Sequence, residues 1–182
     1  GARVIDFCAG AGGKTLALAA RMRNQGQILA FDTEEARLSR LTPRLQRAGV
    51  DIVTALRIDG CDDPRLARYQ GWADLVLVDA PCSGSGTLRR HPDLKWRLQP
   101  DDVAHYQQLQ RTIMLAALRL LRPGGRLVYA TCSLLADENA QQMQWLAERL
   151  GPGWQATTQR AWLPGEQGGD AFFMAAWEKK PG

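Results

Sequence analysis

The sequence predicts an α/β fold in which helices flank a doubly wound, mostly parallel sheet. Three observations lead to this prediction: apolar or β-branched runs alternate with segments of helical periodicity, two later runs are apolar almost throughout, and a Gly-rich turn follows the first run. Continuous apolar runs are typical of strands that are covered on both faces. Their alternation with helices favours parallel strands that are joined by right-handed crossovers.

The expected elements follow one another in a regular order along the chain. Five runs have the composition of strands, three longer segments carry apolar residues at helical spacing, and 62–69 is a shorter connection. A Pro/Gly-rich junction follows 136–150, and two candidate closing strands come after it. The expected strands are 3–8, 27–32, 52–59, 74–79 and 126–132, the helices 15–22, 34–48 and 102–121, and the closing strands 155–159 and 171–178.

Glycine and proline mark the expected ends of the helices. Gly49 is expected to end the second helix, and Pro123-Gly124-Gly125 to end the long helix and turn the chain into the next strand. Pro43 lies inside the second helix and is expected to kink or split it. Because no repeat, low-complexity tract or second domain is evident, residues 1–182 are expected to form one domain.

Composition restricts the class of protein. With 182 residues, 45% hydrophobic and 23% charged, the chain has the make-up of one globular domain rather than of a disordered, collagen-like or coiled-coil protein. A chain of this length buries roughly 70% of its unfolded surface, so stability requires neither metal nor disulfide. No apolar run approaches the ~20 residues that span a bilayer. The start GARVIDF also lacks the features of a signal peptide, so we expect a cytoplasmic protein without a membrane partner.

Charge and cysteines give weaker signals. A net charge of +4 mildly favours a polyanionic partner, although many basic domains bind no nucleic acid. The four cysteines form no CxxC pair, which argues against a zinc ribbon, and no secretory context favours disulfides. Each cysteine could therefore be a small buried hydrophobe, unless its local setting indicates otherwise.

The stretch VIDFCAGAGGKT places glycines between a strand and a helix, where exposed helix N–H groups can hold an anionic or polar ligand. A Walker A loop would need glycine where Cys8 stands, and a dinucleotide fingerprint would need glycine at Thr15. Asp32 ends the second strand, about 20 residues after the glycines, where a ribose-binding carboxylate is expected. The alternative is a tight turn with a helix-capping aspartate.

Strands four and five end in polar motifs that could share one crevice. The first motif begins with Asp79-Ala80-Pro81-Cys82, and the second is Ala130-Thr131-Cys132-Ser133. Because the carboxyl ends of neighbouring parallel strands converge, we expect Asp79, Cys82 and Cys132 to lie together. A thiolate is a strong nucleophile near neutral pH, so this group could perform nucleophilic chemistry. Singly, either cysteine would be interpreted as an inert core residue.

Five segments together resemble the NOL1/NOP2/Sun family of RNA cytosine-C5 methyltransferases: VIDFCAGAGGK, DAPCSGSGT, RRHPDLKW, YATCS followed by ADEN, and the tail LPGEQGGDAFFMAAW. The resemblance extends from residue 3 to about 177. The usual first motif of the family reads C-A-A-P-G-G-K, and this chain lacks its proline but keeps Gly-Gly-Lys.

The resemblance implies a Rossmann-like class I methyltransferase fold with an antiparallel closing strand. It also implies that the cofactor is S-adenosylmethionine (SAM). It implies that Asp32 binds the ribose, that Asp59 lies near the adenine, and that Asp79 faces both the target cytosine and the methionine end. Asp59 could equally be a surface turn acid, because Ile58-Asp59-Gly60 suits a turn. The implied SAM loop consists of Cys8, Ala9, Gly10, Ala11, Gly12, Gly13 and Lys14.

The resemblance also implies a division of labour between the two cysteines. Carbon C5 of cytosine is too poor a nucleophile to take a methyl group directly, so a thiolate must first add to C6. We assign this attack to Cys132, and the resemblance gives Cys82 a part in releasing the 5-methylcytosine product. A DNA cytosine-C5 methyltransferase that attacks with Cys82 remains an alternative, although the second cysteine motif and the lack of a target-recognition insertion argue against it. A non-catalytic nucleotide- or RNA-binding module is another.

The implied partner is RNA, 16S rRNA in the bacterial branch of the family, so that the protein would act in rRNA processing. The segments 89–91 and 95–97 supply cations and an aromatic side chain for phosphate contact and base stacking, unless they form only a solvated basic loop. Family members carry an amino-terminal segment before the first motif, and the bacterial rRNA enzyme also has a helical RNA-binding domain there. We therefore expect this chain to be a catalytic domain, monomeric and without metal.

Overall fold

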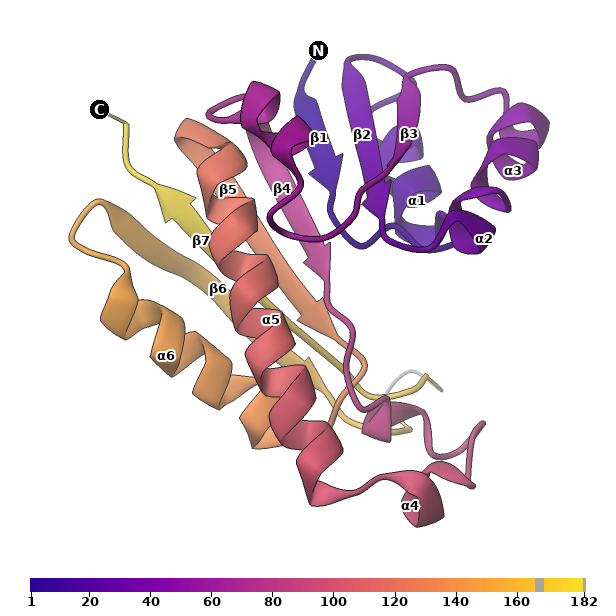
Figure 1. Cartoon of the computed structure of the whole chain (residues 1–182), viewed down its shortest axis with the longest axis vertical. Coiled ribbons are helices and arrows are strands. Elements are labelled where there is room, and N and C mark those ends of the chain that lie inside the picture. Colours follow the sequence, from indigo (N-terminus) through magenta and orange to yellow (C-terminus); the bar gives the residue numbers. More distant parts are fainter. Residues whose placement is uncertain (166–168, 182) are drawn as a thin grey trace.

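The computed structural model describes residues 1–165 and 169–181, and within them seven strands form one sheet of order β3-β2-β1-β4-β5-β7-β6 (Figure 1). The first five strands in the chain are parallel, and β7 runs antiparallel to both of its neighbours. This architecture confirms the expected fold class. The strands are β1 (Arg3–Asp6), β2 (Gln27–Asp32), β3 (Val53–Arg57), β4 (Ala73–Asp79), β5 (Leu121–Thr131), β6 (Trp154–Trp162) and β7 (Phe172–Lys179).

Side-chain alternation along the strands divides the core into two layers. On one face of the sheet, Val4 and Ile28 pack with Ala19 of α1, while Leu41 and Leu45 of α3 pack beside them. On the other face, Ile5 and Phe31 belong to the large cluster that includes residues of η1, α5 and α6. The helices are α1 (Gly13–Arg21), α2 (Glu35–Leu38), α3 (Leu41–Ala48), α4 (Leu94–Arg97), α5 (Pro100–Leu120) and α6 (Ala140–Arg149), with 3-10 turns η1 (Pro64–Tyr69), η2 (Ser85–Thr87) and η3 (Ala136–Glu138).

The strand order reverses direction at β1, which lies between β2 and β4. In a doubly wound sheet, the crevice beyond the carboxyl ends of the strands at such a switch point is the usual ligand site. The register pairs Asp6 with Leu77, and Asp79 with Ala130, so these three strands end at similar heights. The fold therefore places the Gly-rich turn and both cysteine motifs at the same edge.

Two expectations about helix ends need correction. The prediction that Pro123-Gly124-Gly125 ends the long helix is wrong, because α5 stops at Leu120 and Leu121 already pairs with Ala73. The three residues instead form an irregular part of β5, where the register shifts before Arg126. The second helix is split as expected, but the break falls before Leu41, and Pro43 lies in the first turn of α3, where proline is tolerated.

Other boundaries differ by a few residues. The first strand ends at Asp6 rather than at residue 8, because the chain turns into the Gly-rich segment there, and β3 is limited to Val53–Arg57. The strand β6 is longer than expected since it pairs with β7 along most of its length. Residues 166–168 of the tail motif lie outside the described part of the chain. Among the described residues, no helix is long and apolar enough to cross a membrane.

Candidate active site

The Gly-rich turn leaves the amino-terminal end of α1 open toward the crevice. Gly10 and Gly12 have φ angles of 55° and 82°, in the left-handed region that favours glycine. A Cβ atom on Gly12 would also lie 2.1 Å from Cδ1 of Leu41, so the turn packs directly against α3. No side chain caps the first N–H groups of α1 in the described structure. These donors are available for a polar or anionic part of a ligand.

Asp32, the last residue of β2, is hydrogen-bonded to this turn. Its Oδ2 atom accepts a hydrogen bond from the Gly10 N–H at 2.8 Å, and its Oδ1 atom accepts one from the Glu34 N–H at 2.9 Å. The side chain is largely buried. Each carboxylate oxygen has a second lone pair, so Asp32 keeps acceptor capacity for hydroxyl donors in the crevice.

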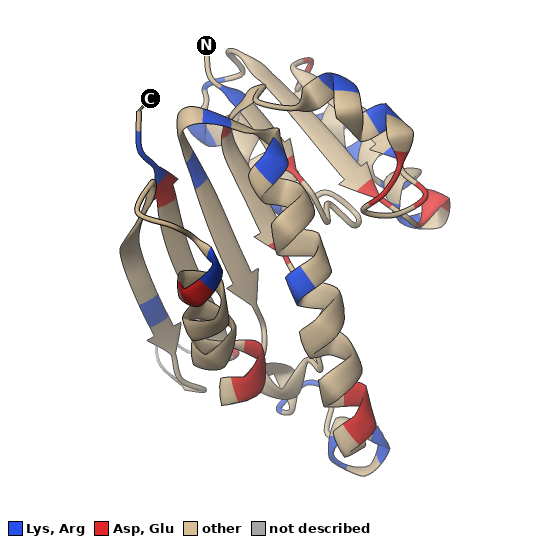
Figure 2. Cartoon of the chain, turned by 60° about the vertical axis from the view of Figure 1, so that its left-hand side comes forward, with Lys and Arg blue, Asp and Glu red and all other residues tan. Residues whose placement is uncertain are grey.

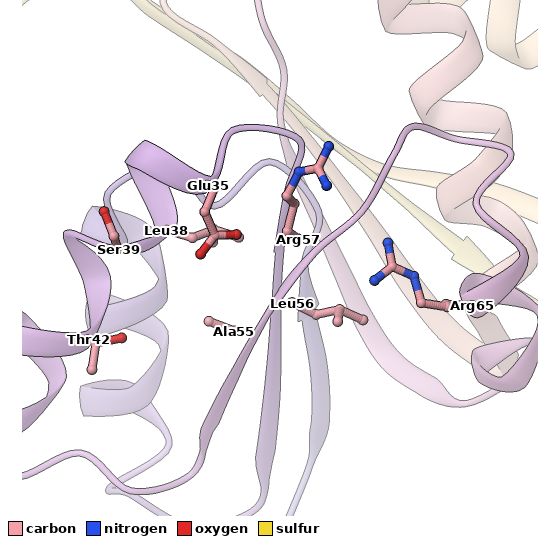
Figure 3. Close-up of a pocket in the computed structure, with 8 residues that line it drawn as sticks. All are labelled: Glu35, Leu38, Ser39, Thr42, Ala55, Leu56, Arg57 and Arg65. Atoms are coloured by element: carbon pink, nitrogen blue, oxygen red, sulfur yellow. The ribbon is translucent and has the colours of Figure 1, made fainter.

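Asp59 occupies a different environment. Its exposed carboxylate forms ion pairs with Arg57 at 2.9 Å and Arg65 at 3.5 Å. Both arginines line a pocket of about 300 Å³ between α2, α3 and β3 (Figure 3). The contacts of Asp59 are thus those of the surface turn acid that the sequence left open, at the flank of the crevice.

Lys14 and Asp79 meet at the centre of the switch point. The Lys14 Nζ atom lies 2.6 Å from Oδ2 of Asp79, and it is also 5.1 Å from the centre of the Phe172 ring. Both charged side chains are about one third exposed. The sequence placed both residues in the site, but it gave no indication that they pair. The pair joins the Gly-rich turn to the end of β4.

The two cysteines are brought together as expected, with their Sγ atoms 3.4 Å apart. The hydrogen bond from Cys82 lowers the pKa of Cys132 to about 7, against the opposing effects of burial and of Asp79. The same hydrogen bond, together with burial, raises the pKa of Cys82. The lowered pKa of Cys132 and the raised pKa of Cys82 favour a thiolate on Cys132 and a thiol on Cys82, which is the arrangement of a nucleophile and its hydrogen-bond donor.

The other two cysteines have the opposite character. Burial raises the pKa of Cys8, with further contributions from Asp6 and Asp32, and burial also raises the pKa of Cys61. Both thiols therefore stay protonated near neutral pH and are poor nucleophiles. Cys8 lies in the expected SAM loop, where its neutral side chain can contribute packing.

Sequence reasoning missed Asp6. This side chain is fully buried at the end of β1, and its Oδ2 atom accepts a hydrogen bond from the Thr15 hydroxyl at 2.7 Å. Its Oδ1 atom is buried without a partner among the described residues. Burial raises the pKa of Asp6 to about 6, and Asp79 adds to the increase, whereas Thr15 opposes it. The signal in the sequence is a carboxylate inside the apolar run RVIDF.

Glu138 was also missed, since the sequence marked it only as part of the ADEN segment. It is fully buried in η3, behind the two cysteine motifs. A buried carboxylate normally needs several hydrogen-bond donors, and Ser83 and Ser133 both donate to this one. Burial of this kind depends on tertiary packing, so the sequence alone could not assign it.

The basic segment, residues 89–97, lies beyond the carboxyl ends of β4 and β5, where the chain leads into α5 (Figures 1 and 2). Trp96 of α4 is 77% exposed, and the Lys95 ammonium lies 4.9 Å from the centre of its ring. Arg90 instead donates to Asp170 at 2.6 Å, and this ion pair holds 89–91 against the region before β7. The segment thus offers an exposed aromatic face flanked by cations. No group of residues suited to hold a metal occurs among those described.

Comparisons of the sequence with known proteins identify a family. The chain matches the family model described as 16S rRNA methyltransferase RsmB/F over residues 1–178. It is 40% identical to Ribosomal RNA small subunit methyltransferase B of Klebsiella pneumoniae and 41% identical to the protein of that name from Vibrio cholerae. Each match covers 99% of this chain and 42% of the relative, so the chain spans about two fifths of the length of these curated relatives.

Two solved structures have a similar fold over almost all of this chain. The crystal structure of PH0851 superposes with a TM-score of 0.93 at 37% identity, and covers 98% of this chain and 43% of that one. NSun6 from Pyrococcus horikoshii with SFG, a SAM analogue, superposes with a TM-score of 0.86 at 28% identity, and covers 98% of this chain and 48% of that one.

Proposed function

Because the chain belongs to the 16S rRNA methyltransferase RsmB/F family, we propose that it transfers a methyl group from SAM to C5 of a cytosine in RNA, with 16S rRNA as the RNA class. The observation that carries this proposal is the pair of thiols 3.4 Å apart, of which Cys132 has the lowered pKa. A methyltransferase that alkylates a more reactive atom would have no need of such a pair. Cytosine C5 requires a nucleophile such as the Cys132 thiolate, since the ring must first be activated by addition at C6.

The chain has features that suit SAM. The open end of α1, the remaining acceptor capacity of Asp32 and the unpartnered Oδ1 atom of Asp6 form a set of donors and acceptors that matches a ligand with a carboxylate, an ammonium group and ribose hydroxyls. We propose that residues 8–14 and Asp32 hold the cofactor, whereas Asp59 contacts it only from the flank. When bound, SAM supplies an electrophilic methyl group.

In the proposed reaction the Cys132 thiolate attacks C6 and forms a carbon–sulfur bond. The electrons of the C5=C6 bond then become available at C5, which takes the methyl group, and the electron pair of the broken methyl–sulfur bond stays on the sulfur of the cofactor. Loss of the C5 proton returns these electrons to the C5=C6 bond, and the C6–S bond breaks to release Cys132. We propose that Cys82 assists that release, directly as a base or through a water; its contact with Cys132 supports this role.

Asp79 is proposed to bind the pyrimidine edge by accepting a hydrogen bond from the N4 amino group, while the Lys14 ammonium beside it offsets the negative charge that develops on the ring during attack. In the structure its carboxylate is held at the end of β4 by Lys14. The alternative of a DNA substrate places the attack on Cys82, whose raised pKa makes it the weaker nucleophile of the two.

The exposed Trp96 face is proposed to stack on a base of the RNA, with Lys95 close to phosphate. This contact would lie at the same edge of the sheet as the cysteines, because α4 is the next helix after the DAPCSGSGT motif, which ends in η2.

The test is methyl transfer from isotopically labelled SAM to 16S rRNA, with single-stranded DNA of the same sequence as the matched substrate. Nucleosides from the digested product are then identified by mass spectrometry. We expect labelled 5-methylcytidine from RNA and no label in DNA. Label in 5-methyldeoxycytidine would favour the DNA alternative, and SAM binding without transfer to either substrate would favour the non-catalytic module.

A further inference from the structure

A fully buried carboxylate lies behind the two cysteine motifs. Glu138 of η3 accepts four hydrogen bonds. Its Oε1 atom accepts from the Ser83 N–H at 2.8 Å and from Nε2 of Gln110 at 3.1 Å, while its Oε2 atom accepts from the hydroxyls of Ser83 and Ser133, both at 2.5 Å. A carboxylate has about four lone-pair sites, so these donors occupy its whole capacity.

The two serines are the residues that directly follow the cysteines. Ser83 follows Cys82 at the end of β4, and Ser133 follows Cys132 at the end of β5. One carboxylate group therefore joins two segments that lie 50 residues apart in the chain. The two segments also bond directly: the Ser83 and Ser133 hydroxyl oxygens are 3.3 Å apart, and the Gly86 N–H donates to the Cys132 carbonyl at 2.9 Å.

Rigid elements hold the carboxylate in turn. The Tyr129 hydroxyl of β5 donates to the Glu138 carbonyl at 2.7 Å, which fixes the backbone of η3. Gln110 of α5 donates both to Glu138 and to the Pro81 carbonyl at 3.0 Å, so the same amide also steadies the residue before Cys82. Glu138 is thus oriented by a strand that ends at the crevice and by a long helix.

We propose that Glu138 is a positioning residue that sets the separation of Cys82 and Cys132 by holding the serine after each. The proposal rests on the proposed function, since it concerns the spacing of the two thiols that perform it. Glu138 is buried behind the cysteine motifs, where it holds Ser83 and Ser133, and its charge adds to the raised pKa of Cys82.

A buried carboxylate without a cationic partner is an expensive way to gain stability. Well-packed apolar groups of the same volume often stabilise as much or more. What four directed hydrogen bonds provide instead is orientation, which matters because a displacement of 1 Å in an active site can cost on the order of 100-fold in rate.

The test measures the reactivity of the Cys132 thiol in the chain without cofactor or RNA. The rate of Cys132 alkylation by iodoacetamide is followed against pH, with peptide mapping to separate it from the other three cysteines. Only the thiolate reacts, so the midpoint reports how well the Cys82 hydrogen bond stabilises it. The other charged groups that act on Cys132 are Asp79 of β4, Lys14 of α1 and Arg90 after η2, and none of them is changed in the variants.

The variants are Glu138→Met, which removes both carboxylate oxygens, and the smaller change Ser133→Ala, which removes one hydroxyl donor to Glu138 together with the acceptor of the Leu135 N–H. If the thiols move apart, the alkylation midpoint rises from near pH 7, and the rate at pH 7 falls about fivefold or more, while the rate at pH 10 stays the same. Glu138→Gln keeps an acceptor for the Ser83 N–H and should give an intermediate midpoint.

The matched control is Asp63→Asn, directly before η1. Asp63 is also a buried carboxylate, and it accepts from the Asp59 N–H and from Arg65, but from neither serine. A wild-type profile in this control, with raised midpoints in Ser133→Ala and in folded Glu138→Met, supports the proposal. A midpoint in Ser133→Ala that equals the control overturns it, whether or not Glu138→Met folds.

The same readout separates this proposal from the proposed function. Alkylation needs no methyl transfer, so inactivity of the wild-type chain on RNA would refute the methyltransferase proposal and leave the profiles interpretable. If wild-type methylation is observed, we further expect Ser133→Ala to lower kcat with an unchanged KM for SAM. A rise in KM alone would contradict a role in spacing the thiols.

Discussion

At the scale of single residues, the site depends on how each carboxylate is partnered. Asp32 binds two backbone N–H groups, Asp79 binds Lys14, and Asp6 leaves one buried oxygen without a partner in the described structure. These differences separate a residue that shapes the Gly-rich turn, a residue that is paired with a lysine at the end of β4, and a residue whose pKa is raised. The same side chain type thus serves three purposes within one crevice.

Removal of the Asp32 carboxylate should weaken SAM binding. The variant Asp32→Ala leaves the Gly10 and Glu34 N–H groups without their acceptor and deprives the ribose of one, which typically costs about 1 to 3 kcal/mol, or roughly tenfold to a hundredfold in affinity. Calorimetric titration with SAM measures this, with the exposed Asp51→Ala at the other end of the sheet as control. Equal affinity in folded Asp32→Ala and in the control would refute the assignment.

The raised pKa of Asp6 predicts a pH dependence of stability. Its folded-state pKa of about 6 exceeds its ordinary value of 3.8, so the folded chain binds this proton more tightly than the unfolded chain does. The resulting stabilisation is complete below about pH 4 and is lost as the pH rises through about 6, and it amounts to ~3 kcal/mol. Asp63, Asp74 and Asp170 have lowered pKa values and act at more acidic pH.

Urea unfolding at pH 4.5 and pH 7 measures this effect. We expect the wild-type chain to lose unfolding free energy between the two pH values and Asp6→Asn to lose much less, because asparagine does not titrate. Parallel losses in the two proteins would show that another group carries the dependence.

At the scale of elements, close backbone approach holds the ends of β5 and β7 around η2. The Gly86 N–H donates to the Cys132 carbonyl at 2.9 Å, and the Gly86 carbonyl accepts from the Ala171 N–H at 3.0 Å. A Cβ atom at residue 86 would lie 2.7 Å from the Cys132 carbonyl oxygen and 2.8 Å from that of Ala171. Because both neighbours are backbone atoms, neither can move without shifting its strand.

Gly86→Ala should therefore displace Cys132. We expect a loss of about 1 to 3 kcal/mol in unfolding free energy and a fall in methyl-transfer rate on the order of 100-fold. The control is Gly151→Ala, where the added Cβ meets no atom within 4 Å. Thermal unfolding and the labelled-SAM assay measure the two quantities, and wild-type activity in Gly86→Ala would mean that the Cys132 segment tolerates the shift.

The elements themselves were largely predictable from the sequence. The strand β2 has the expected bounds, and β4 starts one residue earlier than expected. Both strands could be predicted because short apolar runs of this kind are typical of buried strands. The Pro123-Gly124-Gly125 motif was misplaced, since proline and glycine mark a bulge within a strand as well as the end of a helix. Tertiary pairing of Leu121 with Ala73 decides between the two, and local sequence does not contain it.

At the scale of the whole molecule, the strand order explains how the site is assembled. The reversal at β1 brings the Gly-rich turn next to β4, and the pairing of β4 with β5 brings Cys82 next to Cys132. Convergence of Asp79, Cys82 and Cys132 could be predicted because it follows from parallel strand order alone. Asp6 and Glu138 could not be assigned, because their importance lies in burial and in partners from distant segments.

The central claim is that the two thiols have different tasks, and it is tested most directly by covalent capture of RNA. Cys132→Ala, Cys82→Ala and the control Cys61→Ala are incubated with SAM and labelled RNA, and protein–RNA adducts are separated on a denaturing gel. We expect no adduct and no methylation with Cys132→Ala. Cys82→Ala should attack and methylate but release poorly, so that adduct accumulates, and Cys61→Ala should behave as wild type. Adduct in Cys132→Ala but not in Cys82→Ala would reverse the two roles, and full activity in both variants would contradict the account.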